Sequence, residues 1–499
     1  MQFHGSAAQR RGLFSSSNIY TDSWIRTDLV YGAASVLCFV VGAAIALLGG
    51  LTSLLVTVTL LLGLVVLANY RIGVWIAVLM LPFSATQIFP RQSFGIVGLN
   101  PLNVLLVTTV LSFFFAWVFK QREHTVPKIP PLFWLLVLLI VLAGLYGSQH
   151  VAQIPTYYRI MKLVNFNTAS GYLLDEMLKP MIVVAVAVLV AIVVRNAKRP
   201  TAFVVPLFLS AVLLALVVLA YVAISGIGLG TLASSRSREF LSWMGIHANE
   251  LGLLFNTAFA LALFSCASST RIRVRLAMMA VIVLTTVSVA LTFSRAAFLG
   301  YVLVVGLFLV TRRRFRTVLV GLVVSALVVV IMPQEIVERS MTGIERVDLG
   351  QISAGRVDTI WRPLLPSVLE KPLFGHGLSS TLWSEPARRG TMLPTGHPHS
   401  AYLGLLLDFG IVGAIVIALF YLRLWQLFRR LKVECPDPFW RGFFEGASVC
   451  ILILLVQGVT DDRFTPTFPQ SFMWVSAGLA FGFSDRFSVS STEKVARSD

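Results

Sequence analysis

Long runs of apolar residues follow one another along most of this chain, and each is about as long as a membrane is thick. A helix needs about 17–25 such residues to cross a hydrocarbon layer. The runs do not alternate with polar positions, so they predict helices rather than a barrel. We therefore expect an all-α polytopic membrane protein with about 12–14 transmembrane helices. The expected spans lie near residues 31–49, 51–69, 72–89, 100–119, 129–147, 176–195, 202–224, 250–269, 276–292, 296–311, 317–332, 400–422, 441–459 and 471–484.

Polar stretches divide the chain into five expected parts. These are a cytoplasmic N-terminal segment at 1–27, transmembrane helices over 28–332, a large polar loop at 333–399, the last three helices over 400–484 and a cytoplasmic tail at 485–499. The first part lacks the apolar core of a signal peptide, so we expect the first run to remain as a span. The loop is too long for a simple connection, so we expect it to fold or to carry function.

Basic residues gather at every second turn between the runs, from Arg10 and Arg11 to the group at 423–432. Cytoplasmic loops carry an excess of Lys and Arg, so this alternation predicts cytoplasmic termini and places the long loop on the outer, periplasmic face. The composition agrees, with 57% hydrophobic and 13% charged residues. The same topology, with anionic lipid at the cytoplasmic face, explains most of the net charge of +17. We expect membrane lipids, and no nucleic acid, as partners.

Several kinds of chemistry have no support in the sequence. It contains no glycine-rich phosphate loop after a predicted strand, no Asp-x-Asp pair and no His-Glu-x-x-His helix. The four cysteines fall in expected spans or in a cytoplasmic turn, where they offer neither an outer disulfide nor the spacing of a metal site. We therefore expect no metal and no cofactor. Catalysis would have to rest on Arg, His, carboxylates and positioning.

Cations on the predicted outer face are the first candidate site residues, because Lys and Arg are usually less frequent on that side of a membrane protein. A planar guanidinium group suits phosphate or carboxylate oxygens. Arg295 stands in a tight turn, where desolvation strengthens a contact with phosphate, and Lys179 lies just inside a span, where a cation needs an anionic partner. Arg236, Arg238 and Arg356 are further candidates. Each side chain can instead extend to the membrane surface or pair with a nearby acid.

A histidine pair, His397 and His399, ends the long loop directly before an apolar run. A neutral imidazole at a helix N-terminus has a lowered pKa, which suits a base that takes a proton near pH 7. A loop histidine can equally be structural. Earlier in the loop, Arg356 and Trp361 have the spacing of one face of a short helix.

The loop and its flanks contain a set of motifs: Gly355-Arg356, Trp361, the run KPLFGHG at 371–377, His399-Ser400-Ala401-Tyr402-Leu403, and Asp408-Phe409-Gly410 with Gly413. Upstream stand Thr292-Phe293-Ser294-Arg295 and an element, 244–250, that ends in Asn-Glu. Together these motifs resemble the signature of the bacterial O-antigen ligase and polysaccharide polymerase superfamily. The resemblance covers roughly residues 236–483, and the N-terminal half matches only as a set of apolar spans.

The resemblance implies a metal-independent, inverting, GT-C-like glycosyltransferase at the outer face of the bacterial inner membrane. Its donor would be a glycan on undecaprenyl pyrophosphate. The glycan acceptor would be lipid A-core in a ligase, or a second lipid-linked repeat unit in a polymerase. Other polysaccharide assembly proteins are further partners that the resemblance implies.

The resemblance also assigns roles to residues. His399 would be the catalytic base, and Arg295, with Arg238 or Arg236, would bind the pyrophosphate. The family commonly has His-Asn where this chain has His399-Ser400, and His397 is the alternative base. The other residues expected to bind substrate are Arg356, Lys179, Trp361, Tyr402 and His397, with the two aromatic rings either stacked on sugars or anchored at the membrane surface.

Polymerase and ligase cannot be separated on these motifs. We favour a polymerase of secreted or capsular polysaccharide, because such proteins are frequent. A transporter or flippase is the alternative from another class, and it would show ionisable groups at the membrane midplane and internal repeats. The main intramembrane acids expected here are Asp408 and Glu445, and no repeat is visible.

Overall fold

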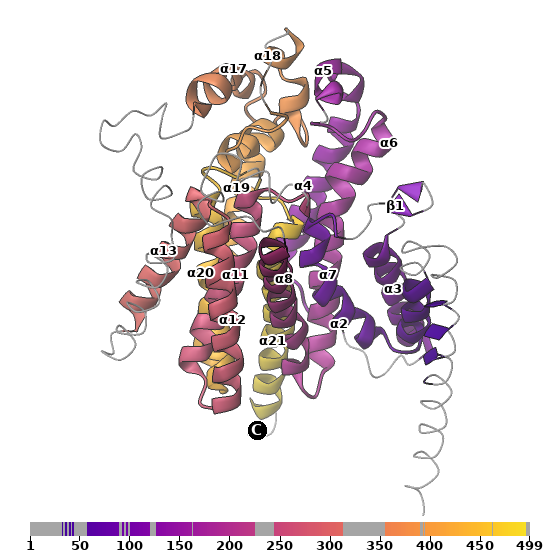
Figure 1. Ribbon diagram of the computed structural model, residues 1–499, viewed down its shortest axis with the longest axis vertical. Coiled ribbons are helices and arrows are strands. Elements are labelled where there is room, and N and C mark those ends of the chain that lie inside the picture. Colours follow the sequence, from indigo (N-terminus) through magenta and orange to yellow (C-terminus); the bar gives the residue numbers. More distant parts are fainter. Residues whose placement is uncertain are drawn as a thin grey trace, which may run out of the picture. The chain divides into compact units, whose positions relative to one another are not determined.

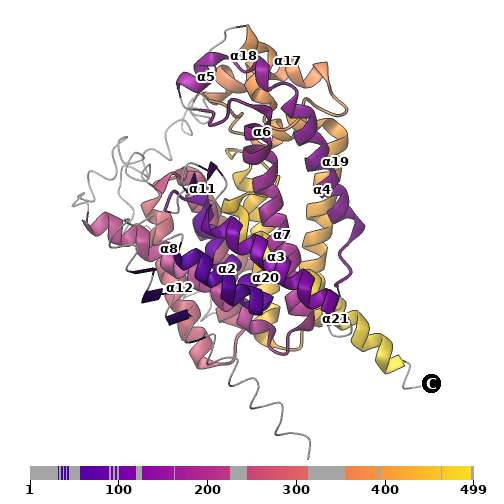
Figure 2. The ribbon, with the colours of Figure 1, turned by 90° about the vertical axis from the view of Figure 1, so that its right-hand side faces the viewer.

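The computed structural model describes residues 57–88, 92–93, 96–97, 100–119, 126–161, 163–224, 244–312, 355–389, 393, 395–461 and 463–495, together with seven separate residues between 32 and 43. The helices and the one hairpin of these residues are drawn in Figures 1 and 2, coloured along the sequence. The chain divides into two compact units. One comprises Met1–Gly73 with Gln92–Phe115, and the other Val74–Arg91 with Ala116–Asp499.

The smaller unit holds a helix at Thr57–Ala68, the beginning of α2 (Tyr70–Met80) and most of α3 (Pro101–Phe119). A two-residue hairpin, β1 (Gln92–Ser93) with β2 (Ile96–Val97), pairs Gln92 with Val97. A Cβ atom on Gly73 would lie 2.1 Å from Oγ1 of Thr109, so the glycine allows α2 and α3 to approach closely. The Ser112 hydroxyl donates to the Leu67 carbonyl at 3.0 Å and links α3 to the Thr57–Ala68 helix.

Within the described residues, eight helices are long and apolar enough to cross a membrane. The all-α polytopic class is therefore confirmed. The expected spans near 31–49 and 317–332 lie outside the described part of the chain, apart from the seven separate residues. The eight helices are α3, α4 (Pro131–Ser148), the continuous stretch Ala169–Asn196, the stretch Pro200–Ile224, α11 (Ala248–Ser268), α12 (Ile272–Leu291), α19 (Ala401–Glu434) and α20 (Pro438–Gln457).

Shorter elements complete the larger unit. The stretch Ala169–Asn196 consists of α6 (Ala169–Tyr172), a π-helical turn, η3 (Leu173–Leu178), and α7 (Lys179–Asn196). The stretch Pro200–Ile224 contains η4 (Pro200–Phe203) and α8 (Val205–Ile224). The remaining elements are η1 (Pro82–Ala85), η2 (Val151–Gln153), α5 (Thr156–Ile160), α13 (Arg295–Thr311), η6 (Val357–Trp361), α17 (Arg362–Glu370), η7 (Ser380–Trp383), α18 (Glu385–Arg388), η8 (Phe468–Gln470) and α21 (Ser471–Val495).

Small residues let the central helices approach one another. Gly442 and Gly446 lie one turn apart on α20, and a Cβ at either would come within 2.7 Å of a carbonyl oxygen of α11. Gly478 and Gly482 repeat this arrangement on α21 against α7. In apolar surroundings, close contact of this kind is a main source of helix association. The two Gly-x-x-x-Gly pairs therefore fix the pairs α11–α20 and α7–α21 at the core.

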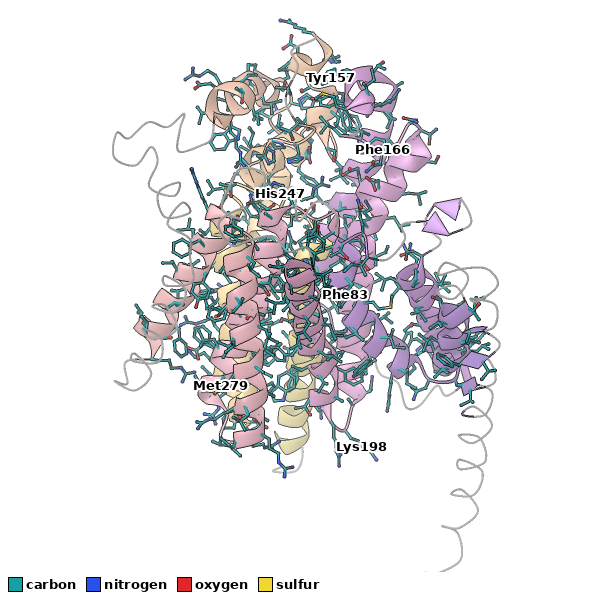
Figure 3. The ribbon with its side chains drawn as sticks, in the orientation of Figure 1. Phe83, Tyr157, Phe166, Lys198, His247 and Met279 are labelled. Carbon is teal, nitrogen blue, oxygen red and sulfur yellow. The ribbon has the colours of Figure 1, made fainter. Side chains whose placement is uncertain are left out.

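Ion pairs gather at one end of the larger unit, which we call the basic end. Glu445 accepts from Arg312 at 2.6 Å and from Lys432 at 2.7 Å, where α13 and α19 finish and α20 begins. Arg195 pairs with Asp485 at 2.7 Å between α7 and α21. We call the opposite end, where α11, α13 and α19 begin, the site end. Figure 3 shows His247 toward the site end and Lys198 at the basic end.

The described part of the long loop, from residue 355, leads into the three final helices α19, α20 and α21, as expected. Its KPLFGHG run lies against a break in α19 at Gly410, where φ is +65°. The His376 N–H donates to the Leu407 carbonyl at 2.7 Å, and the Ile411 N–H donates to the Pro372 carbonyl at 2.8 Å. The loop thus pairs backbone groups that the break would leave unsatisfied.

Gly410 gives the first prediction. Gly410→Ala should destabilise the protein by about 2–4 kcal/mol, because the positive φ disfavours a side chain and the new Cβ would lie 2.4 Å from the Leu373 carbonyl carbon. Thermal unfolding of the purified protein in detergent measures this effect. Gly306→Ala on α13 is the matched control, since nothing lies within 4 Å of its Cβ position. Equal melting temperatures for the two variants would contradict the role of the break.

Candidate functional site

Three helices begin at the site end, and polar contacts join the first turns of α11 and α13 to each other and the start of α19 to the end of α20. The Ser294 hydroxyl, at the start of α13, donates to Asn249 Oδ1 in the first turn of α11 at 2.6 Å. The backbone N–H of Ala401, the first residue of α19, donates to the Gly458 carbonyl after α20 at 2.8 Å. The rings of His247 and His399 lie 6.3 Å apart. Helix N-termini carry partial positive charge and unpaired N–H groups, so this region favours an anion.

Arg295 is the first residue of α13 and follows a sharply folded turn. Phe293 has a φ of +48°, and the Ser294 side chain caps the helix by accepting from the Ala297 N–H at 3.2 Å. Two side chains from other helices also hold this first turn: Asn256 donates to the Ala297 carbonyl at 2.7 Å and Gln457 to the Ala296 carbonyl at 3.0 Å. The partly buried Arg295 is therefore carried by a helix start that neighbouring side chains hold in place.

His399 stands directly before the capping residue of α19, as Phe293 does before that of α13. Its φ is +49°, and Ser400 caps the helix by accepting from the Leu403 N–H at 3.4 Å. A non-glycine residue with positive φ is uncommon and persists only where its surroundings determine it. His397 Nε2 lies 3.0 Å from His399 Nδ1, so the two candidate bases form one pair.

Trp361 and Tyr402, both expected to bind substrate, make contacts within the protein. The Trp361 indole N–H donates to the carbonyl of Pro398, between the two histidines, at 2.8 Å. The Tyr402 hydroxyl donates to the Leu455 carbonyl at 2.8 Å, and its ring packs edge-on against Phe464. Trp361 thus supports the histidine pair, and Tyr402 links α19 to the end of α20. Arg356 lies partly buried just before the η6 turn that carries Trp361.

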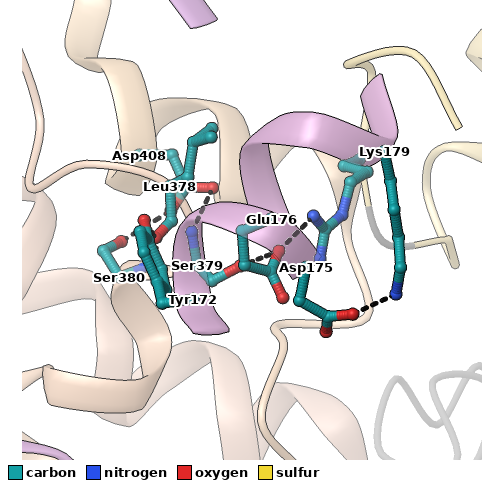
Figure 4. A network of polar contacts seen from close by, with 9 residues as sticks. Tyr172, Asp175, Glu176, Lys179, Leu378, Ser379, Ser380 and Asp408 are labelled. Atoms are coloured by element: carbon teal, nitrogen blue, oxygen red, sulfur yellow. Dashed lines mark hydrogen bonds and ion pairs between the residues drawn. The ribbon is translucent and has the colours of Figure 1, made fainter. Parts of the chain in front are cut away.

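Lys179 belongs to a different polar group at the site end (Figure 4). It pairs with Asp175 one turn earlier, which provides the anionic partner that the sequence required. Beside it, Glu176 accepts from Arg463 and from the Ser379 hydroxyl, both at 2.6 Å. We call this second group the Glu176 cluster. Its other members are Ser380, whose hydroxyl donates to Asp408 at 2.7 Å, and Tyr172, whose hydroxyl donates to the Leu378 carbonyl at 2.7 Å.

Sequence reasoning missed Arg463 and Glu176. Arg463 directly follows Asp461 and Asp462 in a short link, so the link has no excess of positive charge that would draw attention. Glu176 and Arg463 are 287 positions apart, and no local pattern joins them. Arg236 and Arg238, which the sequence proposed beside Arg295, lie outside the described residues. Within the described part, no group of three or more His, Cys, Asp or Glu side chains is arranged to hold a metal ion.

The loop surface beyond α4 is cationic. Lys371 hydrogen-bonds the Tyr146 hydroxyl, and its ammonium group lies 4.9 Å from the centre of that ring. Burial lowers the pKa of His150, and the positive charges of Lys371, His376 and Arg388 lower it further. The lowered pKa favours the neutral form of His150 at pH 7.

Comparison with known proteins agrees with these features. Residues 280–418 match the family described as O-antigen ligase. The match includes Arg295, the histidine pair and the break at Gly410, and it confirms the resemblance to the O-antigen ligase and polysaccharide polymerase superfamily. A comparison with curated proteins returned no match. The apolar helices define a multi-pass membrane protein, and its residues 280–418 are similar to the O-antigen ligase family.

The Glu176–Arg463 pair gives a second prediction. Replacing Glu176 by Gln and Arg463 by Met, singly and together, should reveal a coupling of about 1–3 kcal/mol in the free energy of unfolding, because breaking one partner leaves the other poorly solvated. The Glu176 and Arg463 side chains are 12% and 30% exposed. Unfolding in mixed micelles measures the coupling.

The exposed pair Arg430–Glu434 is the control for this cycle. Its side chains are 58% and 36% exposed, so its coupling should not exceed about 0.5 kcal/mol. Similar couplings for the two pairs would mean that the Glu176 cluster contributes no more than a surface contact.

Proposed function

We propose that this protein is a polysaccharide polymerase or ligase of the bacterial inner membrane. It transfers a glycan from undecaprenyl pyrophosphate to a sugar hydroxyl of a second lipid-linked repeat unit and inverts the anomeric centre. The observation that carries the proposal is the meeting of three helix starts around Arg295 and the histidine pair. Such a region suits the charge of a pyrophosphate next to a base.

The depth of Arg295 supports a lipid-linked donor. The 17 residues of α13 rise about 26 Å, and Arg312, directly after them, is paired with Glu445 at the basic end. A hydrocarbon layer is about 30 Å thick. With the basic end at one membrane surface, Arg295 lies near the other. That is the level of the pyrophosphate of a donor whose polyprenyl tail stays in the bilayer.

The chemistry needs only positioning, charge and one base. Arg295 and the helix starts stabilise the negative charge on the leaving pyrophosphate, with Arg238 or Arg236 proposed as a second cation. His399 accepts the proton of the acceptor hydroxyl. The hydroxyl oxygen attacks the anomeric carbon from the face opposite the pyrophosphate, and the bond to the pyrophosphate oxygen breaks with its electron pair.

The distribution of basic residues supports the proposed orientation. Arg195, Arg312 and Lys432 lie at the basic end, and an excess of such residues is typical of the cytoplasmic side. We therefore propose that the site faces the periplasm and that both termini are cytoplasmic. Membrane lipids surround the protein, and other polysaccharide assembly proteins are proposed partners.

Two alternatives differ in their support. A ligase that transfers the glycan to lipid A-core would use the same site, and the description of the matched family favours it. Transport has less support, because both candidate intramembrane acids are engaged: Asp408 accepts from Ser379 and Ser380, and Glu445 is paired at the basic end.

The size distribution of lipid-linked glycans tests the function. It is measured in cells from which the protein has been deleted, both without complementation and with the wild type, His399→Ala or the control His150→Ala supplied again. A polymerase is indicated if single lipid-linked repeats accumulate in the cells without the protein and the His399→Ala variant does not remove them. Long chains that remain on the carrier indicate a ligase. Unchanged lipid-linked glycans in the cells without the protein would contradict both readings, and normal function of His399→Ala would favour transport.

We expect Asn249 to support glycan transfer by holding the turn that positions Arg295. Asn249→Ala removes the acceptor of the Ser294 hydroxyl and loosens the turn that positions Arg295, so glycan transfer should fall by about 10–100-fold. Asn196→Ala is the matched control, because Asn196 bonds the Ile192 carbonyl toward the end of α7. Transfer by purified protein, per folded molecule, measures both variants. Equal rates would mean that Arg295 does not depend on this contact.

A further inference from the structure

The two histidines of the pair share one hydrogen bond. His397 Nε2 and His399 Nδ1 lie 3.0 Å apart, and the two rings are inclined at 77°. A hydrogen bond between two imidazole rings needs an N–H on one and a lone pair on the other. The roles of the two residues in proton transfer are therefore linked and cannot be assigned separately.

Several contacts fix the backbone around the histidine pair. Thr395 Oγ1 donates to the His397 carbonyl at 3.2 Å and accepts from the His397 N–H at 3.3 Å. Trp361 holds the Pro398 carbonyl, and the Ser400 cap follows the left-handed His399. Four consecutive positions, 397–400, are thus fixed by a backbone bond, a cap or a special conformation. The contact between the rings belongs to a rigid local structure.

We infer that His397 is a positioning residue that fixes the tautomer and orientation of His399. This inference rests on the proposed function. His399 Nδ1–H donates to His397 Nε2, which leaves the only lone pair of the His399 ring on Nε2. That atom takes the proton of the acceptor hydroxyl while the hydroxyl oxygen bonds to the anomeric carbon and the pyrophosphate leaves with its electron pair. The imidazolium that forms keeps its Nδ1–H bond to His397.

The opposite arrangement would make His399 inactive as a base. If His397 donated to His399 Nδ1, the proton of neutral His399 would be on Nε2, which could then accept nothing. The orienting partner in other base-assisted transfers is commonly a carboxylate. Here a neutral imidazole takes that place, which avoids an extra negative charge beside a pyrophosphate.

Substitution of His397 by amides of two lengths tests the inference. The amide end of Gln reaches the position of His Nε2, whereas that of Asn is one methylene shorter. We expect His397→Gln to keep kcat within about 10-fold of the wild type, and His397→Asn and His397→Ala to lose about 100-fold in kcat, with KM changed by less than about 3-fold. The donor is the lipid-linked glycan extracted from cells that lack the protein, and rates are taken per folded molecule.

His399→Ala and His150→Gln complete the set. His150→Gln should match the wild type, and His399→Ala should be inactive. If His399→Ala is inactive but His397→Ala is fully active, the positioning role is overturned and the proposed function stands. If His397→Gln is as inactive as His397→Ala, His397 is itself the base or a general support, and the inference is again overturned. If His399→Ala remains active, the proposed mechanism fails and the inference fails with it.

Discussion

Buried backbone groups must find their partners inside the protein, and this constraint determines where the site lies. An unpaired N–H or C=O in apolar surroundings costs several kcal/mol, and each helix start leaves N–H groups without an intrahelical partner. At the site end, His247, Ser294 and Ser400 cap α11, α13 and α19. The Ser294 hydroxyl also donates to Asn249 and joins the first turns of α11 and α13. In the proposed function, N–H groups of these first turns that lack a partner within their own helix bind the anionic substrate.

The break in α19 follows from the same constraint. A helix that opens at Gly410 exposes carbonyl and amide groups, and the loop segment from Pro372 to Gly377 pairs with them. Glycine is required on both sides, because a Cβ at Gly375 would lie 2.5 Å from the Asp408 carbonyl carbon. The loop is therefore anchored to α19 well before it reaches the histidine pair. The motifs KPLFGHG and Asp408-Phe409-Gly410, known from the sequence only as a family signature, form this anchor.

Local signals made part of the molecule predictable from its sequence. Apolar runs predicted the spans, the turn before α13 drew attention to Arg295, and the end of the long loop drew attention to His399. The break in α19 was not predictable, because it depends on pairing between positions about 40 residues apart, such as Pro372 and Ile411. Glu176 was missed for the same reason, since its partners Ser379 and Arg463 come from distant segments. The sequence predicted that Trp361 stacks on sugars or anchors at the membrane surface, and it gave no sign of the bond from its N–H to the loop backbone.

Strain at two equivalent positions suggests how the site is kept rigid. Phe293 and His399 each adopt a left-handed backbone directly before a capping serine and a helix, at a cost of about 1–2 kcal/mol each. Because the two side chains differ in chemistry, we attribute the left-handed conformation to the geometry of the turn and not to the type of side chain. Each turn is held from outside, by Asn249 in one case and by Trp361 in the other. In the proposed mechanism, a charged group and a base fixed in this way need little reorganisation when charge develops on the pyrophosphate, and reduced reorganisation is a main source of rate enhancement. The polar contacts between helices therefore stabilise the packing of the bundle and also fix the positions of the candidate site residues.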